Sequence, residues 1–182
     1  MKDQANKFSG ITIGFHWVIA LAMMGMLGLG LYLEDMPRGP EKFALVGWHK
    51  TIGVMILLIA VPRVIWRLSN GMPHAASIMP KWQARSASIV HWFLLIGTVM
   101  MPVSGIMMTA GGGHPLDFFG VQLLAQGDKI PVLDQAGHIL HGLGGKLILL
   151  AVILHIAGAV KHHVVDKDGT LRRMLGATIK LP

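Results

Sequence analysis

The chain contains no cysteine and few charged residues. Without thiols among its 182 residues, disulfides, cysteine-ligated iron–sulfur clusters and covalent c-type haem attachment are all excluded. Charged side chains make up only 14% of the chain, hydrophobic ones make up 53%, and the mean hydropathy is +0.57. These values are far from those of a soluble globular domain of this length. The composition therefore indicates an integral membrane protein in which any redox centre is held by ligands other than cysteine.

Four apolar stretches are long enough to cross about 30 Å of hydrocarbon, which takes about 20 helical residues. They cover residues 11–33, 44–66, 88–110 and 137–160. The first lacks a convincing small-residue cleavage site, so we expect a retained span and not a signal peptide. The sequence predicts an all-α membrane protein, a single domain over residues 1–182, folded as an up-down-up-down bundle of four transmembrane helices.

Charge placement predicts the orientation of this bundle. The N-terminus, the last residues of the second span with the loop that follows it, and the C-terminal tail carry 11 of the 16 Lys and Arg residues, but only three of the nine acids. The positive-inside rule therefore predicts that both termini are cytoplasmic. Because topology explains the net charge of +7, the sequence gives no reason to expect a nucleic-acid partner.

Histidines recur inside or at the rim of the apolar stretches, where an ionisable side chain is costly and usually functional. His141 and His155 are 14 residues apart, which separates them by ~21 Å along one helix and within ~40° of one face. His16 is predicted at the depth of His155, and His49 at that of His141. Paired imidazoles are the usual axial ligands of b-type haem, so we expect pairs His16–His155 and His49–His141 to bind two haems. His162 lies seven residues beyond His155, near the same face.

A further histidine leaves the inner pair open. His91 is predicted at much the same depth as His16, so either is a possible partner of His155. A weak internal repeat bears on this choice, since the His-Trp pair at His16 recurs at His91 and residues 49–61 resemble residues 141–153. If the repeat reflects a duplication, His91 is a relic, a hydrogen-bond donor to a ligand, or the true partner of His155.

These motifs resemble the bacterial cytochrome b561 family of four-span, two-haem membrane proteins. The similarity covers nearly the whole chain. In the first three spans it is carried by Phe15-His16-Trp17, by His49 before an aliphatic run ending in Arg63 and Arg67, and by His91. In the last span and tail it is carried by His155, His162-His163 and the run from Lys167 to Met174.

The resemblance implies two haem b groups on His16, His49, His141 and His155, electron exchange with ubiquinone, and a place in the bacterial inner membrane. The family includes superoxide oxidases, which take an electron from periplasmic superoxide and pass it through the haems to ubiquinone. We therefore expect a superoxide:ubiquinone oxidoreductase, with membrane lipid, the quinone pool and superoxide as partners.

Two flanking sites follow from this expectation. For quinone, the best candidate hydrogen-bond donor or proton carrier is His162, supported by His163, Arg63 and Arg67. Anchoring to anionic lipid heads explains the arginines equally well. For superoxide, Lys50 and Lys146 are candidates for a local positive collar that steers the anion.

Two other functions remain open. The same fold serves as a haem b anchor subunit that exchanges electrons between quinone and a redox partner protein, such as a dehydrogenase or hydrogenase. A membrane transporter or non-haem metal carrier is the alternative of another class. The absence of Asp and Glu from the middle of every predicted span argues against ion transport.

Overall fold

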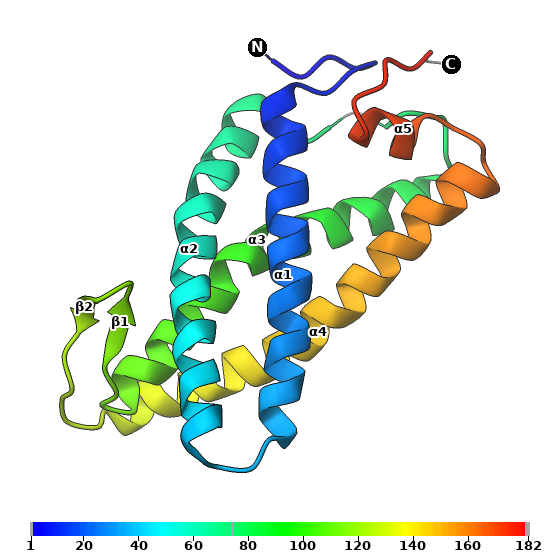
Figure 1. Ribbon diagram of the computed structural model, residues 1–182. Coiled ribbons are helices and arrows are strands. Elements are labelled where there is room, and N and C mark those ends of the chain that lie inside the picture. Colours follow the sequence, from blue (N-terminus) through cyan, green and yellow to red (C-terminus); the bar gives the residue numbers. More distant parts are fainter. Residues whose placement is uncertain (1, 74, 181–182) are drawn as a thin grey trace. The chain divides into compact units, whose positions relative to one another are not determined.

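The computed structural model describes residues 2–73 and 75–180 and is mostly helical (Figure 1). Its elements in chain order are α1 (Gly10–Asp35), α2 (Pro40–Asn70), α3 (Lys81–Gly111), β1 (Leu116–Phe118), β2 (Val121–Leu124), α4 (Pro131–Val164) and α5 (Thr170–Met174). Four helices, α1 to α4, are long and apolar enough to cross a membrane. This confirms the predicted fold class, and each helix extends beyond the apolar stretch that predicted it.

Proline marks both the ends and the interiors of the long helices. Pro40 and Pro131 are the first residues of α2 and α4, where the missing amide hydrogen costs nothing. Pro62 and Pro102 lie inside α2 and α3. Interior proline is tolerated in membrane helices because neighbouring groups satisfy the freed carbonyl.

A small β-hairpin occupies the long connection between α3 and α4. Strands β1 and β2 pair antiparallel, with Phe118 opposite Val121. The two residues between them, Phe119 and Gly120, both have positive φ, 48° and 85°. Positive φ at both central positions is the geometry of a type I′ turn, which matches the twist of the strands.

The chain divides into two compact units, and each long helix contributes to both. The unit that we call the terminal unit comprises residues 2–18, 62–96 and 148–180 of the described chain. The other, the hairpin unit, comprises Ile19–Val61 and Gly97–Leu147 and includes the β-hairpin. The terminal unit contains His16, His91 and His155, and the hairpin unit contains His49 and His141.

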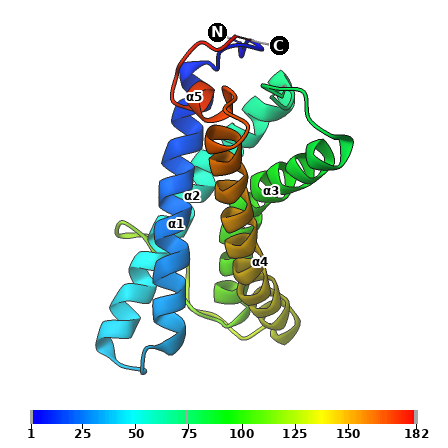
Figure 2. The ribbon, with the colours of Figure 1, turned by 90° about the vertical axis from the view of Figure 1, so that its right-hand side faces the viewer.

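In the terminal unit, the segments before α1 and after α4 lie side by side (Figures 1 and 2). The guanidinium of Arg173, whose residue is only 4% exposed, donates to the carbonyl of Ala5 at 2.6 Å and lies 4.2 Å from the ring centre of Phe8. The amide of Ile179 donates to the carbonyl of Asn6 at 2.9 Å. We call these contacts the terminal clasp. They close this end of the unit around a buried cation.

Candidate functional site

The terminal unit brings three histidines of different helices together. The ring centres of His16 and His155 are 6.0 Å apart, and those of His91 and His155 are 5.2 Å apart. An imidazole nitrogen binds a transition metal at about 2 Å and lies about 1.1 Å from its ring centre, so two rings sharing one metal ion stand about 6 Å apart. The His16–His155 separation matches that value, whereas the His91–His155 separation is shorter by nearly 1 Å.

The hairpin unit contains one matched pair. His49 of α2 and His141 of α4 have ring centres 6.0 Å apart and an interplanar angle of 77°. This is the same separation as in the His16–His155 pair, so the residues fit an iron held between two imidazoles. The Nδ1 atom of His49 is buried and is without a hydrogen-bond partner within residues 2–73 and 75–180. An unpaired buried ring nitrogen is costly in a protein interior unless a ligand satisfies it.

The orientation of His141 is fixed by α3. Its Nδ1 lies 3.0 Å from the carbonyl oxygen of Met101 and 3.1 Å from Oγ of Ser104. A carbonyl only accepts, so Nδ1 carries the hydrogen and Nε2 presents its lone pair. A carbonyl behind the ligating imidazole is the usual device for holding a metal-binding ring in place.

Gly105 provides room for the His141 ring. A Cβ atom at this position would lie 3.2 Å from Cε1 of His141 and 3.4 Å from its Nδ1. Any larger residue therefore pushes the ring away from its place. Small residues at helix interfaces commonly allow this kind of close approach in membrane proteins.

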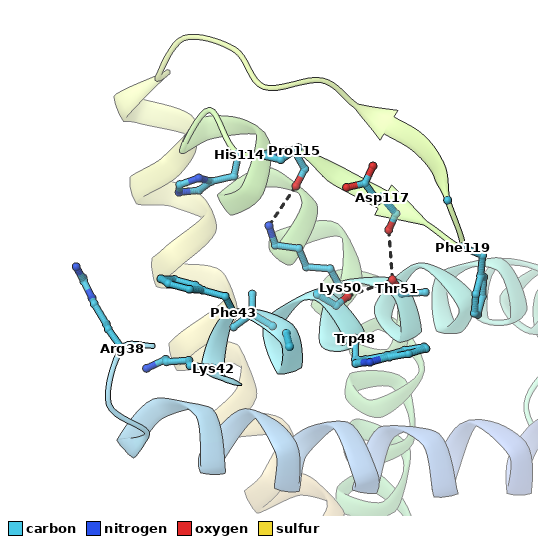
Figure 3. Close-up of a pocket in the computed structure, with 14 residues that line it drawn as sticks. Arg38, Lys42, Phe43, Trp48, Lys50, Thr51, His114, Pro115, Asp117 and Phe119 are labelled. Carbon is cyan, nitrogen blue, oxygen red and sulfur yellow. Dashed lines mark hydrogen bonds between the residues drawn. The ribbon is translucent and has the colours of Figure 1, made fainter. Parts of the chain in front are cut away.

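A cavity of about 650 Å³ lies between the start of α2 and the β-hairpin connection (Figure 3). Three cationic side chains, Arg38, Lys42 and Lys50, line it with one acid, Asp117. The ammonium group of Lys50 donates to the carbonyl of Pro115 at 3.3 Å (Figure 3). Trp48 and Lys50, the chain neighbours of His49 in α2, both line the cavity, whereas the His49 side chain does not.

Lys146, the other predicted steering residue, lies outside the lining of this cavity. Its ammonium group is 3.5 Å from a carboxylate oxygen of Glu34, and both side chains are more than half exposed. Such exposed pairs are weak. The structure therefore brings Lys50, and not Lys146, together with other cations.

Arg67 takes part in a largely buried ion pair of the terminal unit. Its Nη1 lies 3.2 Å from Oδ2 of Asp3, and each side chain is 12% exposed. Asp3 also accepts from the Ser9 amide at 2.9 Å and from the Thr12 hydroxyl at 2.8 Å. Burial raises the pKa of Asp3, but these hydrogen bonds and the arginine outweigh it, so the pKa lies below its usual range. Arg67 thus fastens the N-terminal segment to α2.

The other predicted quinone residues lie in the same unit with different surroundings. Arg63 is half-buried and within electrostatic range of His16 and His155. His162 is largely buried, with its Nδ1 2.8 Å from a carboxylate oxygen of Asp168, whereas the neighbouring His163 is exposed. Of these residues, Arg63 and His162 have the buried polar groups that a ligand site requires.

Sequence reasoning missed Asp3, Met101 and Ser104 because their partners lie far away along the chain. The Met101 carbonyl and His141 are 40 residues apart, and Asp3 and Arg67 are 64 apart. The only sequence signal at Met101 is that Pro102 and Gly105 interrupt an otherwise apolar helix.

The chain matches known proteins over nearly its whole length. Residues 7–177 match the family model described as prokaryotic cytochrome b561. "Cytochrome b561 homolog 2" of Escherichia coli is 31% identical, over 94% of this chain and 92% of the relative. "Probable superoxide oxidase CybB" of Yersinia pestis is 26% identical, over 93% and 96%. The chain therefore belongs to the prokaryotic cytochrome b561 family, and is a multi-pass membrane protein that binds haem b and transfers electrons.

Proposed function

We propose that this protein oxidises superoxide and reduces ubiquinone through two haem b groups. The observation that carries the proposal is the cation-lined cavity next to His49, which suits a small anionic electron donor. The relative from Yersinia pestis named as a probable superoxide oxidase supports the same reaction. In balance, two superoxide anions lose one electron each to give two O2, and one ubiquinone takes two electrons and two protons to give ubiquinol.

Four histidines would hold the haems. His49 and His141 would hold one, and His16 and His155 the other, because both pairs have the 6.0 Å separation that shared ligation requires. The shorter distance from His91 to His155 favours a supporting role for His91. When bound, haem iron supplies reversible one-electron transfer.

The cavity would attract superoxide. Arg38, Lys42 and Lys50 outnumber the one acid of the lining, Asp117, so the local charge is positive although the surrounding connections also carry acids. A locally positive cleft raises the encounter rate of an anion by about 10- to 1000-fold, and salt weakens the effect.

The quinone would bind in the terminal unit. His162 would hydrogen-bond a quinone oxygen, and Arg63, within electrostatic range of His16, would stabilise the negative charge that develops on the ring during reduction. His163 and Arg67 would contribute at the margin of the site. The same proposal puts the protein in the bacterial inner membrane with both termini in the cytoplasm, the orientation that its basic residues favour.

The test is stopped-flow mixing of the purified protein, without any partner subunit, with superoxide. We expect superoxide to reduce the haem, ubiquinone-1 to reoxidise it, and the haem content to be two per chain. Lys50→Gln should slow haem reduction about three- to tenfold and weaken its dependence on ionic strength. Lys146→Gln is the matched control with the same charge change and should stay near wild type. Protein whose haem superoxide fails to reduce would refute this function and favour an anchor subunit for a partner enzyme.

A further inference from the structure

A histidine and a carboxylate are paired at the end of α4 in the terminal unit. Nδ1 of His162, in the last turn of α4, lies 2.8 Å from Oδ2 of Asp168, in the segment that follows the helix. The side chains are only 16% and 8% exposed. This largely buried pair differs from the other His–Asp pair of α4, His138 with Asp134, which is 3.3 Å apart and 64% and 35% exposed.

The carboxylate of Asp168 has hydrogen bonds to His162 and to two further residues, Ser77 and Thr170. The hydroxyl of Ser77, in the connection between α2 and α3, donates to Oδ2 at 2.7 Å, and the amide of Thr170 donates to Oδ1 at 2.8 Å. Burial raises the pKa of Asp168, but the hydrogen bonds from Ser77, Thr170 and His162 outweigh it and lower the pKa to about 2. The carboxylate is therefore ionised at neutral pH and only accepts hydrogen bonds.

An accepting carboxylate fixes the tautomer of its histidine. Since Asp168 cannot donate, Nδ1 of His162 carries a hydrogen, and Nε2 is the ring nitrogen left for a ligand. Other charges also face the pair. A carboxylate oxygen of Asp166 lies 3.1 Å from Nδ1 and 2.7 Å from the Lys161 ammonium group, and Arg173 is within electrostatic range of Asp168.

We propose that Asp168 is the positioning residue of a proton-delivery pair, in which Nε2 of protonated His162 gives its hydrogen to the reduced quinone. This rests on the proposed quinone site. The quinone takes up two electrons from the superoxide side. The Nε2–H bond breaks as an O–H bond forms on the quinone oxygen. Throughout this step Nδ1 keeps its hydrogen and its hydrogen bond to Asp168. A hydronium ion of the adjoining solvent then returns a proton to Nε2 and is left as water, so that one histidine passes two solvent protons to the quinone in turn. A carboxylate behind the imidazole favours this role because its hydrogen bond to Nδ1 prevents the ring from turning and leaves Nε2 for the quinone.

The test follows the quinone step alone. Detergent-purified holoprotein, reduced with a limiting amount of dithionite, is mixed with ubiquinone-1, and haem oxidation is followed between pH 5.5 and 9. Asp168→Asn should slow oxidation at least tenfold at neutral pH and move the alkaline fall of the rate to lower pH. Asp168→Glu should restore part of the rate. Asp134→Asn, which removes the exposed carboxylate of the other pair, is the matched control and should leave the rate and its pH profile unchanged.

A merely structural Asp168 would behave differently. An unchanged rate in Asp168→Asn, or a slower rate with an unshifted pH profile, would overturn the proposal. If Asp168→Asn does not fold, Ser77→Ala carries the test, since it removes one donor to the carboxylate and should produce a smaller change in the same direction. Wild-type protein that ubiquinone-1 does not oxidise would also overturn it. Reduction of the haem by superoxide is measured in a separate experiment and should be normal in all variants. If superoxide fails to reduce the wild-type haem, the superoxide reaction is refuted, but the quinone test still applies because dithionite supplies its electrons.

Discussion

Replacing Gly105 by alanine should weaken haem binding at the His49–His141 pair. The new Cβ would lie 3.2 Å from Cε1 of His141, and normal contacts require the ring to move by a few tenths of an ångström. The ring's hydrogen bond to the Met101 carbonyl, now 3.0 Å, would then stretch toward the limit of such bonds. Overpacking of this kind costs about 1–3 kcal/mol, and the strained hydrogen bond about 0.5–1.5 kcal/mol.

The helical preference of alanine works in the opposite direction by up to about 1 kcal/mol. Gly142→Ala is the control for this term, because a Cβ at Gly142 meets nothing within 4 Å. The difference between the two variants therefore isolates displacement of the His141 ring. Its expected size is the sum of the two costs, about 1.5–4.5 kcal/mol, equal to about a ten- to 2000-fold loss of haem affinity at one of two sites.

The assay is the haem-to-protein ratio after purification, followed by transfer of haem to apomyoglobin. Gly105→Ala should release one haem faster than wild type, with the other unaffected, and Gly142→Ala should match wild type. Equal haem retention in both variants, with unchanged redox potentials, would mean that His141 is no ligand or that its ring moves freely.

Three further outcomes are expected. His16→Ala should lose one haem in a reduced-minus-oxidised spectrum, whereas His91→Ala should keep both; the reverse result would make His91 the ligand. Asp3→Asn should lower the free energy of unfolding by about 2–4 kcal/mol, because it leaves a largely buried arginine unpaired. Since the pKa of Asp3 is lowered in the folded protein, Asp3 contributes to the free energy of unfolding above the usual carboxyl pKa, and this contribution is lost as the pH falls through the lowered value. The thermal stability of Asp3→Asn should therefore depend less on pH in that range than the thermal stability of the wild type. Glu34→Gln, by contrast, should change stability by less than about 1 kcal/mol, because its ion pair is exposed; a loss as large as that of Asp3→Asn would contradict this ranking by burial.

Hydrophobic length and histidine spacing were enough to predict the four spans and to align the histidines in depth. Depth follows from the helical rise, which depends only on residue number. It cannot separate His16 from His91, because both lie at the depth of His155. Their different distances to His155 depend on how the helices pack around one another, which a single sequence does not specify.

Polar contacts between distant segments were beyond prediction for a related reason. The partners Ser77 and Asp168 are 91 residues apart. Neither belongs to a periodic pattern of apolar residues from which its neighbours in space could be predicted. The β-hairpin was also missed, since its strands are three and four residues long and Phe119 adopts a backbone conformation unusual for its type. Short strands of mixed composition give too little alternation to be recognised.

The terminal clasp has a consequence for biosynthesis. Ala5 is translated 168 residues before Arg173, the residue whose side chain bonds its carbonyl. At 5–20 residues per second, translation takes about 8–34 s to cover that interval. The segment around Ala5 therefore stays unfastened until Arg173 has been synthesised, so the terminal clasp forms only after all four long helices have been translated.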